Sequence, residues 1–384
     1  MTRTVHVLSD GLRTPNSAAL VYPLLVHGGA LRDRGIVVRL LEMADRDYAD
    51  CDLLIVDSKH FSGPERGQLS FVQDALQSFG EKVPLIWYDS TDSAGWLVGG
   101  VMPLVRRYFK NQLLRDRSAY TRPMYGRRAY TDYYHRIAGV TDSQPEDAPT
   151  LSDGRLLDRL RLGWNSGLAD YSRWGPLRCE SYRRFRFPAL QARRTFSPAS
   201  KRRRIQLSCR MGISYARDTV AYQRRQLAAR LGKRLKTGKL GRGAYFAELR
   251  DSRLVVSPFG LGEITLKDFE VFLTGGLLVK PDMTHLVTWP DLYRPDETMA
   301  AFAWDLSDFE AVIDRYLSDP KRASDVAAAG QDRYLRHVSG GDAMGLFADR
   351  FVALVDEALI GADNPAPGPV QPRLSTTAAA GFAS

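Results

Sequence analysis

A glycine-rich stretch in the second half of the chain has residue types suited to binding an anion. It contains, in order, Ser257, Gly260, Gly262, Glu263 and Lys280. Glycine lets a backbone approach a ligand closely, and the first turn of a following helix offers unpaired N–H groups to negative charge. The stretch therefore predicts a site for an anionic ligand such as a phosphate.

The elements around this stretch predict how its residues are positioned. Residues 252–256 form an apolar strand, and an amphipathic helix follows the loop and ends at the glycine pair 275–276. A second apolar strand then reaches Lys280. Such a strand–helix–strand step belongs to a parallel sheet, in which ligands bind outside the carboxyl ends of the strands. Both ends of the stretch are expected there.

The first half of the chain alternates apolar strands with amphipathic helices. The predicted strands are 4–8, 36–40, 52–57 and 84–89, and the predicted helices are 16–34 and 68–79. This alternation is typical of a doubly wound parallel sheet. Polar residues follow its strands at 10–11, 57–60 and 89–93, which we expect to border one cleft. No G-x-G-x-x-G follows the first strand, so a dinucleotide site in this half is poorly supported.

The chain length predicts two domains, since single hydrophobic cores stop growing at roughly 250 to 300 residues. We place the first Rossmann-like domain at 1–200, with 141–200 as its loop and basic connection, and the second at 201–345. A closing helix over 346–360 and a disordered, Ala- and Pro-rich tail over 361–384 complete the prediction.

Composition and charge predict the cellular compartment of the chain and the kinds of partner that it binds. Neither end carries a long apolar run or a signal peptide, so the chain is expected in the cytoplasm without a membrane span. Three widely spaced cysteines favour neither a disulfide framework nor a zinc site. The net charge of +10 is concentrated in residues 178–204. That block fits a solvated linker, an anionic lipid or membrane surface, or, with least support, nucleic acid.

The second half resembles the GT-B glycosyltransferases, notably bacterial group-1-like and CgeB-like members. The resemblance covers about residues 204–350 and is carried by Ser257-Pro258, the loop 260–263, the helix 269–276, and the segments 317–320 and 327–330. It implies an α/β fold of the GT-B kind, in which two Rossmann-like parallel-sheet domains face a central cleft. The first domain would bind an acceptor and the second a nucleotide-sugar donor.

The resemblance also implies roles for residues of the second domain. Glu270 stands where family members have a Glu that accepts hydrogen bonds from the donor ribose. Retaining members often carry a second Glu eight positions earlier, but that position is Gly262 and the nearby acid is Glu263, so retention of stereochemistry does not follow. Arg210 and Arg217, near the first strand of the domain, are predicted ligands of the diphosphate. Ser257, Gly260, Gly262, Glu263 and Lys280 complete the predicted donor site.

A catalytic base is expected from the first domain. Glycosyl transfer needs a base for the acceptor hydroxyl if it inverts, and His suits that role near neutral pH, whereas Asp needs a raised pKa. The candidates that follow strand or loop ends are Asp10, His60, Asp89, Asp92 and His135, and among them His135 and Asp92 are favoured.

The predicted function is transfer of a sugar from a nucleotide-diphosphate sugar to a hydroxyl acceptor, without a metal or other cofactor. The acceptor is expected to be a surface-polysaccharide or lipid-linked glycan, and the basic block favours peripheral contact with an anionic membrane rather than nucleic acid. Two alternatives stay open: a GT-B sugar-nucleotide epimerase, and a non-catalytic protein that binds an anionic polymer or nucleic acid.

Overall fold

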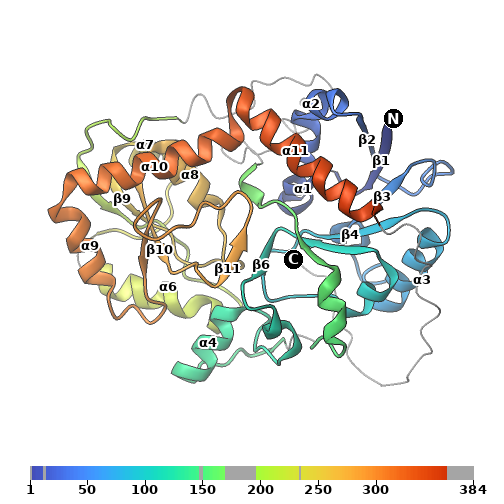
Figure 1. The fold of residues 1–384 in the computed structure, drawn as a ribbon. Helices are drawn as coiled ribbons and strands as arrows, with labels where there is room; N and C mark the ends of the chain where they lie inside the picture. Colours follow the sequence, from blue (N-terminus) through green and yellow to red (C-terminus); the bar gives the residue numbers. More distant parts are fainter. Residues whose placement is uncertain (1, 12–13, 147–149, 169–195, 233–234, 361–384) are drawn as a thin grey trace.

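A computed structural model describes residues 2–11, 14–146, 150–168, 196–232 and 235–360. Its first domain is built on a parallel six-stranded sheet with the strand order β2-β1-β3-β4-β5-β7 (Figure 1). The strands are β1 (Arg3–Leu8), β2 (Ile36–Leu41), β3 (Leu53–Asp57), β4 (Leu85–Asp89), β5 (Arg107–Lys110) and β7 (Leu160–Leu162). Every residue of β3 and β4 is buried, as expected for a parallel sheet covered on both faces. The prediction of a doubly wound α/β domain is confirmed.

Helices and short turns of 3-10 helix connect these strands. The predicted helix 16–34 is two helices, because a second helix starts at Gly28 after the first ends at Val26. The α-helices are α1 (Pro15–Val26), α2 (Gly28–Asp33), α3 (Leu69–Gly80) and α4 (Ala129–Ala138). The 3-10 helices are η1 (Ser58–Phe61), η2 (Gly99–Leu104), η3 (Arg117–Thr121), η4 (Gly154–Arg159) and η5 (Ser166–Leu168).

The second domain contains a four-stranded parallel sheet with the order β12-β10-β9-β8. Its strands are β8 (Ile205–Ser208), β9 (Ser252–Val256), β10 (Leu277–Pro281) and β12 (Ala300–Phe302), and its helices are α6 (Asp218–Leu231), α7 (Arg242–Asp251), α8 (Leu266–Thr274), α9 (Phe309–Ser318) and α10 (Pro320–Val338). Helix α7 was not predicted, because its glycine-punctuated start indicates a connection rather than a helix. The predicted strand–helix–strand step of β9, α8 and β10 is present.

Local chemistry fixes both ends of α8. A capping box begins the helix, in which Thr265 accepts from the N3 backbone and the Asp268 carboxylate accepts from the Thr265 N–H at 3.0 Å. The helix ends at Gly275, whose φ of +69° is the left-handed conformation that glycine adopts at low cost. Helix α8 therefore has a defined start at the carboxyl end of β9.

An antiparallel pair of short strands joins the two domains. Strand β6 (Gln112–Leu114) of the first domain pairs with β11 (Leu286–Thr288) of the second, with Leu286 opposite Leu114 and Thr288 opposite Gln112. Neither strand was predicted, because three residues are too few to show a period of two. The pairing lies beyond the carboxyl ends of β5 and β10, so it closes one flank of the interdomain interface.

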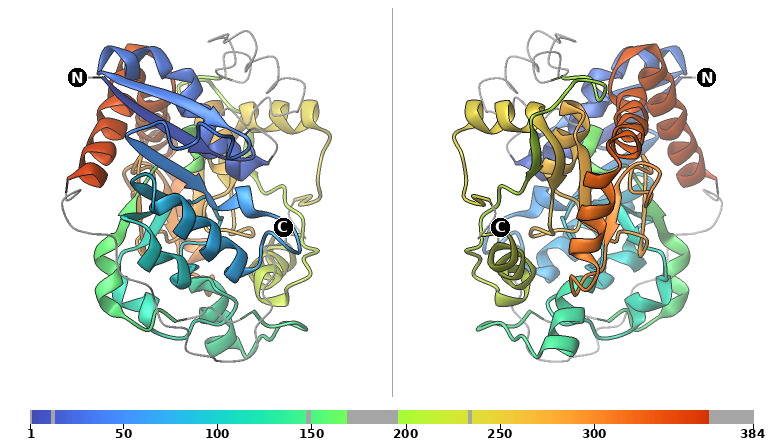
Figure 2. Two further views of the ribbon diagram at one scale, coloured as in Figure 1. Left: turned by 90° about the vertical axis from the view of Figure 1, so that its right-hand side faces the viewer. Right: turned by 90° about the vertical axis from the view of Figure 1, so that its left-hand side faces the viewer.

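The last helix, α11 (Gly340–Leu359), returns to the first domain (Figures 1 and 2). Phe347 and Phe351 contact the Trp164 ring, with centroids 5.2 and 6.0 Å apart, in the core cluster that contains β1 and β3 side chains. The helix begins six residues before the predicted start of 346. The tail 361–384 and most of the basic block 178–204 lie outside the described residues.

Candidate functional site

Two acids at the ends of the first-domain strands are buried, and each is hydrogen-bonded or ion-paired to neighbouring side chains. Asp57, at the end of β3, accepts hydrogen bonds from Ser9 at 2.8 Å and Ser90 at 2.7 Å, and burial raises its pKa. Asp89, at the end of β4, is 2.7 Å from the Lys110 ammonium. Burial opposes its charged form, but the Lys110 charge holds the pKa of Asp89 below its ordinary value. Neither acid reaches solvent, so Asp89 has a structural role rather than that of the predicted base.

The two histidine candidates are held within the first domain. His60 is buried, its Nε2 lies 3.0 Å from an Arg66 nitrogen, and burial together with the Arg66 charge lowers its pKa to about 4. His135 stacks on Tyr125 with ring centroids 3.9 Å apart, and its Nδ1 lies 2.9 Å from the Val140 carbonyl oxygen. These contacts tie His135 to the end of α4 rather than to the strand ends.

Asp92 follows β4 at the point where the two domains meet. The residue is exposed, and desolvation by the surrounding protein raises the pKa of its carboxyl group. The charges of Lys59 and Arg128 oppose that rise. A carboxyl group with a raised pKa that is open to solvent is suited to accept a proton. Among the predicted bases, Asp92 has the geometry that fits the role best.

The glycine-rich loop packs against the first domain, which corrects the expectation that its glycines face a ligand. Tyr130 donates a hydrogen bond of 2.6 Å to the Gly260 carbonyl oxygen. A Cβ at Gly262 would lie 2.3 Å from the Asp92 carbonyl oxygen, so only glycine fits. Glu263 is fully buried and accepts from the Ala94 N–H at 3.0 Å, and burial raises its pKa.

Ser257 and Lys280 belong to a buried polar network beneath this loop, so both predictions of a nucleotide contact need correction. Asp268 is its centre. It accepts a hydrogen bond of 2.6 Å from Ser257, another of 3.0 Å from Tyr293, and lies 3.1 Å from the Lys280 ammonium. Lys280 is fully buried, and burial lowers its pKa. These side chains hold the β9 and β10 ends together and are not available to a ligand.

A second group of polar side chains lies on the side of α8 that faces α7. Glu270 is half-buried and accepts a hydrogen bond of 2.8 Å from the Tyr245 hydroxyl of α7, and burial raises its pKa. Lys267 stands one helical turn earlier, donates to the Arg210 carbonyl oxygen, and has a pKa lowered by burial to about 8. Lys267 and Tyr245 were not predicted site residues, although Lys267 and Glu270 have the i, i+3 spacing of one helix face.

The two predicted diphosphate ligands are ion-paired with acids. The Arg210 guanidinium, at the end of β8, binds both oxygens of Glu248 at 2.7 to 3.0 Å. Arg217 precedes the first turn of α6, rather than lying just inside it, and pairs with Glu146 of the first domain. Arg210 is therefore next to Lys267 in the second domain, whereas Arg217 contributes to the domain contact.

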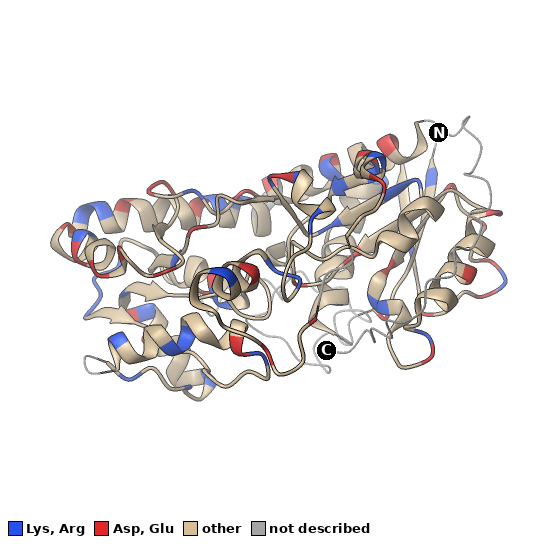
Figure 3. Cartoon of the chain, turned by 90° about the horizontal axis from the view of Figure 1, so that it is seen from below, with Lys and Arg blue, Asp and Glu red and all other residues tan. Residues whose placement is uncertain are grey.

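Charged side chains of both signs are spread over the described ranges (Figure 3). Lys and Arg are interspersed with Asp and Glu on both domains there (Figure 3). Those ranges contain no cluster of three His, Cys, Asp or Glu side chains that could hold a metal ion. No helix in the same part of the chain is long and apolar enough to cross a membrane.

Two parallel α/β domains whose carboxyl strand ends face each other, with a final helix that returns to the first domain, define the GT-B class of architecture. Residues 184–348 match the model of a family described as glycosyl transferase-like. The match covers less than half of the chain and includes the second sheet, α8 and Glu270. No curated protein matches the sequence.

Several solved structures are similar in architecture. An alpha-glucosyltransferase in complex with UDP-glucose and DNA is 12% identical with a TM-score of 0.42, and the alignment covers 92% of this chain and 100% of that one. HepE from Anabaena in complex with UDP-glucose is 10% identical, with a TM-score of 0.45 and the same coverage. Sucrose-phosphate synthase from Thermosynechococcus elongatus is 12% identical, with a TM-score of 0.43 and coverage of 93% and 100%.

Proposed function

We propose that this protein transfers a sugar from a nucleotide-diphosphate sugar to a hydroxyl acceptor. The observation that carries the proposal is Glu270, half-buried on α8 beside Lys267, within the segment that matches the glycosyl transferase-like family. Glu270 would accept hydrogen bonds from the ribose hydroxyls, and Tyr245 holds its carboxylate in place. Lys267 would place positive charge near the departing diphosphate.

In the proposed reaction the acceptor oxygen forms a bond to the anomeric carbon of the donor. The bond from that carbon to the diphosphate breaks, and the nucleoside diphosphate leaves with the electron pair. Asp92 accepts the proton of the acceptor hydroxyl, because its raised pKa makes it a stronger base than an ordinary Asp. Closure of the loop 257–263 on the first domain would exclude water from the reacting groups.

The first experiment is a thermal-shift screen with uridine, guanosine, cytidine and adenosine diphosphates and their sugar conjugates. At least one nucleotide should raise the melting temperature of the wild-type protein, and the shift should disappear in Glu270→Gln. Glu310→Gln, on the exposed side of α9, is the matched control. If no nucleotide stabilises the wild-type protein, the donor-site proposal fails.

The acceptor, the compartment and the independence from metal are parts of the same proposal. We infer a glycan or lipid-linked acceptor at the cytoplasmic face of an anionic membrane, supported by the basic block 178–204 and by the basic, aromatic residues 104–134. Co-sedimentation with phosphatidylglycerol vesicles, compared with phosphatidylcholine vesicles, tests the membrane contact. Transfer that persists in EDTA tests the independence from metal. An epimerised donor without glycan product would identify an epimerase instead.

A further inference from the structure

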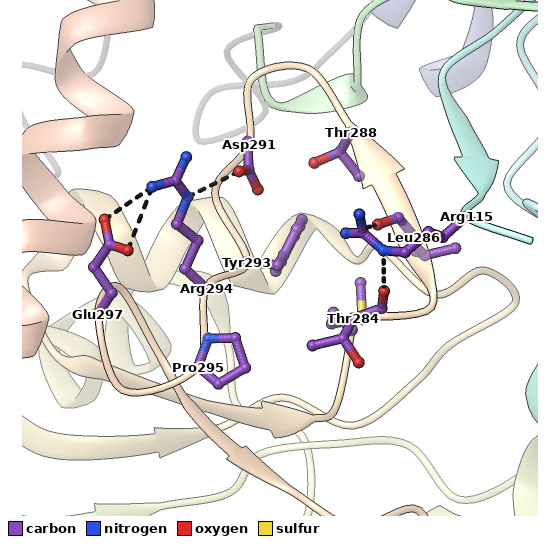
Figure 4. A pocket seen from close by; sticks show the side chains of 10 residues that line it. Arg115, Thr284, Leu286, Thr288, Asp291, Tyr293, Arg294, Pro295 and Glu297 are labelled. Carbon is purple, nitrogen blue, oxygen red and sulfur yellow. Dashed lines mark hydrogen bonds and ion pairs between the residues drawn. The ribbon is translucent and has the colours of Figure 1, made fainter.

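A cavity of about 240 Å³ lies beside the β6–β11 pair, apart from the α8 face that carries Glu270 (Figure 4). Apolar and aromatic groups of Leu286 and Tyr293 form part of its lining, together with the charged side chains of Arg115, Arg294 and Glu297. Binding sites for small molecules combine such an apolar surface with a few placed polar groups. The volume is below the roughly 300 to 1,000 Å³ of drug-sized sites, which fits a ligand the size of one sugar ring.

Both domains contribute to this cavity. Arg115 follows β6 in the first domain, and its guanidinium donates to the Thr284 carbonyl oxygen at 2.7 Å and to the Leu286 carbonyl oxygen at 3.1 Å. The opposite wall is the segment 291–297 of the second domain. The cavity therefore exists in this form only while the two domains are in contact.

The charged groups of the second wall are held in fixed positions by one another. Arg294 donates to Asp291 at 2.8 Å and to Glu297 at 3.2 Å (Figure 4). Glu297 also accepts from Arg333 at 2.6 Å. Such ion pairs offset most of the net charge, yet each carboxylate keeps lone pairs and each guanidinium keeps N–H groups for a further partner. Fixed donors and acceptors of both kinds suit the hydroxyl groups of a neutral sugar better than an anion.

One residue that lines the cavity, Tyr293, is hydrogen-bonded to α8, the helix of the proposed donor site. Tyr293 is 6% exposed, and its hydroxyl donates to Asp268 at 3.0 Å. Asp268 is also the acidic member of the capping box that begins α8, the helix of Glu270. The tyrosine ring is therefore fixed relative to the donor helix, and it contributes apolar surface to the lining of the cavity.

The position of the cavity relative to Asp92 fits a longer acceptor. The Gln112 side-chain amide donates to the Asp92 carbonyl oxygen at 2.6 Å, and Thr288 of the cavity wall lies opposite Gln112 in the β6–β11 pair. Arg115 is three residues beyond Gln112, or about 10 Å at about 3.3 Å per residue. A saccharide of two or three residues spans that distance.

From these observations we propose that the Arg115–Tyr293–Arg294–Glu297 cavity is an acceptor subsite, which binds a neutral sugar residue one or two units away from the hydroxyl that reacts at Asp92. The inference rests on the proposed glycosyl transfer. It assigns specificity for an oligosaccharide acceptor to a segment that the donor site does not use.

The test is saturation-transfer NMR on the full-length protein with seven neutral probes: glucose, galactose, mannose, N-acetylglucosamine, maltose, lactose and chitobiose. At least one disaccharide should show saturation with the wild-type protein, and Glu297→Gln and Arg294→Ala should each weaken its binding at least about tenfold. Arg155→Ala is the control, because Arg155 is exposed and pairs only with Asp153 in the contacts described for it. Thermal melting verifies that each variant is folded.

Absence of saturation for all seven probes overturns the subsite, and so does wild-type affinity in both Glu297→Gln and Arg294→Ala. The nucleotide screen separates this failure from that of the proposed function. Nucleotide binding without sugar binding removes the subsite alone, whereas the loss of both removes the glycosyl-transfer proposal as well.

Discussion

Replacing Gly262 by Ala should hinder contact between the two domains while leaving each domain folded. The added Cβ would lie 2.3 Å from the Asp92 carbonyl oxygen and 2.8 Å from the Asp92 Cβ. Both atoms belong to the chain next to β4 rather than to the end of a flexible side chain, so they cannot move aside easily. The loop or the whole second domain must therefore shift.

The structure sets the size of this effect. Overpacking of a well-packed contact costs about 1–3 kcal/mol. If that cost falls only on the arrangement in which the two domains are in contact, the equilibrium constant for forming that contact decreases by about 5- to 150-fold. Turnover in glycosyl transfer should fall by up to the same factor, because the proposed reaction needs Asp92 of the first domain and Glu270 of the second domain in one arrangement. Small-angle X-ray scattering should show a larger radius of gyration in Gly262→Ala than in the wild-type protein.

Gly29→Ala is the matched control, since Gly29 is in α2 and a Cβ there meets no atom within 4 Å. It should keep the wild-type scattering and turnover, with a small gain in stability of about 0.4–1 kcal/mol. Wild-type scattering together with wild-type turnover in Gly262→Ala would refute the reasoning. Reduced turnover with unchanged scattering would instead locate the effect in a local displacement of Asp92.

Three further predictions concern single side chains. Glu270→Gln should weaken nucleotide binding by roughly 10- to 150-fold, as expected for hydrogen bonds to a charged group worth about 1.5–3 kcal/mol, and titration calorimetry measures it. Lys280→Met leaves the Asp268 carboxylate buried without its cation, so the free energy of unfolding in urea should fall by about 3–5 kcal/mol. Glu263→Gln should unfold at higher urea than the wild-type protein at pH 8 and at equal urea at pH 4. Burial raises the pKa of Glu263 above its ordinary 4.5, so the stability that this residue contributes is complete below pH 4.5 and is lost as pH rises through the folded-state pKa.

Each of these predictions has a result that contradicts it. Unchanged nucleotide affinity in Glu270→Gln removes Glu270 from the donor site. Wild-type stability in Lys280→Met means that Asp268 gains a proton or water at little cost. A difference between Glu263→Gln and wild type that is independent of pH means that the pKa of Glu263 is the same in the folded and the unfolded protein.

The sequence alone determined the architecture, because hydrophobic periodicity and turn residues are local properties. Strands of continuous apolar residues, such as 53–57 and 85–89, and the glycine pair after 274 marked the parallel α/β elements. The resemblance of residues 257–276 to a family then singled out Glu270, which the structure places half-buried on α8, next to Tyr245 of α7. The three-residue strands β6 and β11 were not predicted from the sequence, because they depend on pairing across the domains rather than on a local pattern.

Only the tertiary structure decided what the glycine-rich loop and its charged neighbours do. A Gly-rich loop before a helix has the same local sequence whether it faces a phosphate or another domain, and here the first domain occupies that space. Lys280 has the residue type of an anion ligand, but the fold surrounds it with protein and pairs it with Asp268. The partners of buried charges come from distant positions in the chain, where a local sequence pattern does not reveal them. The sequence therefore determined which groups carry charge, whereas packing determined which of them remain accessible to a ligand.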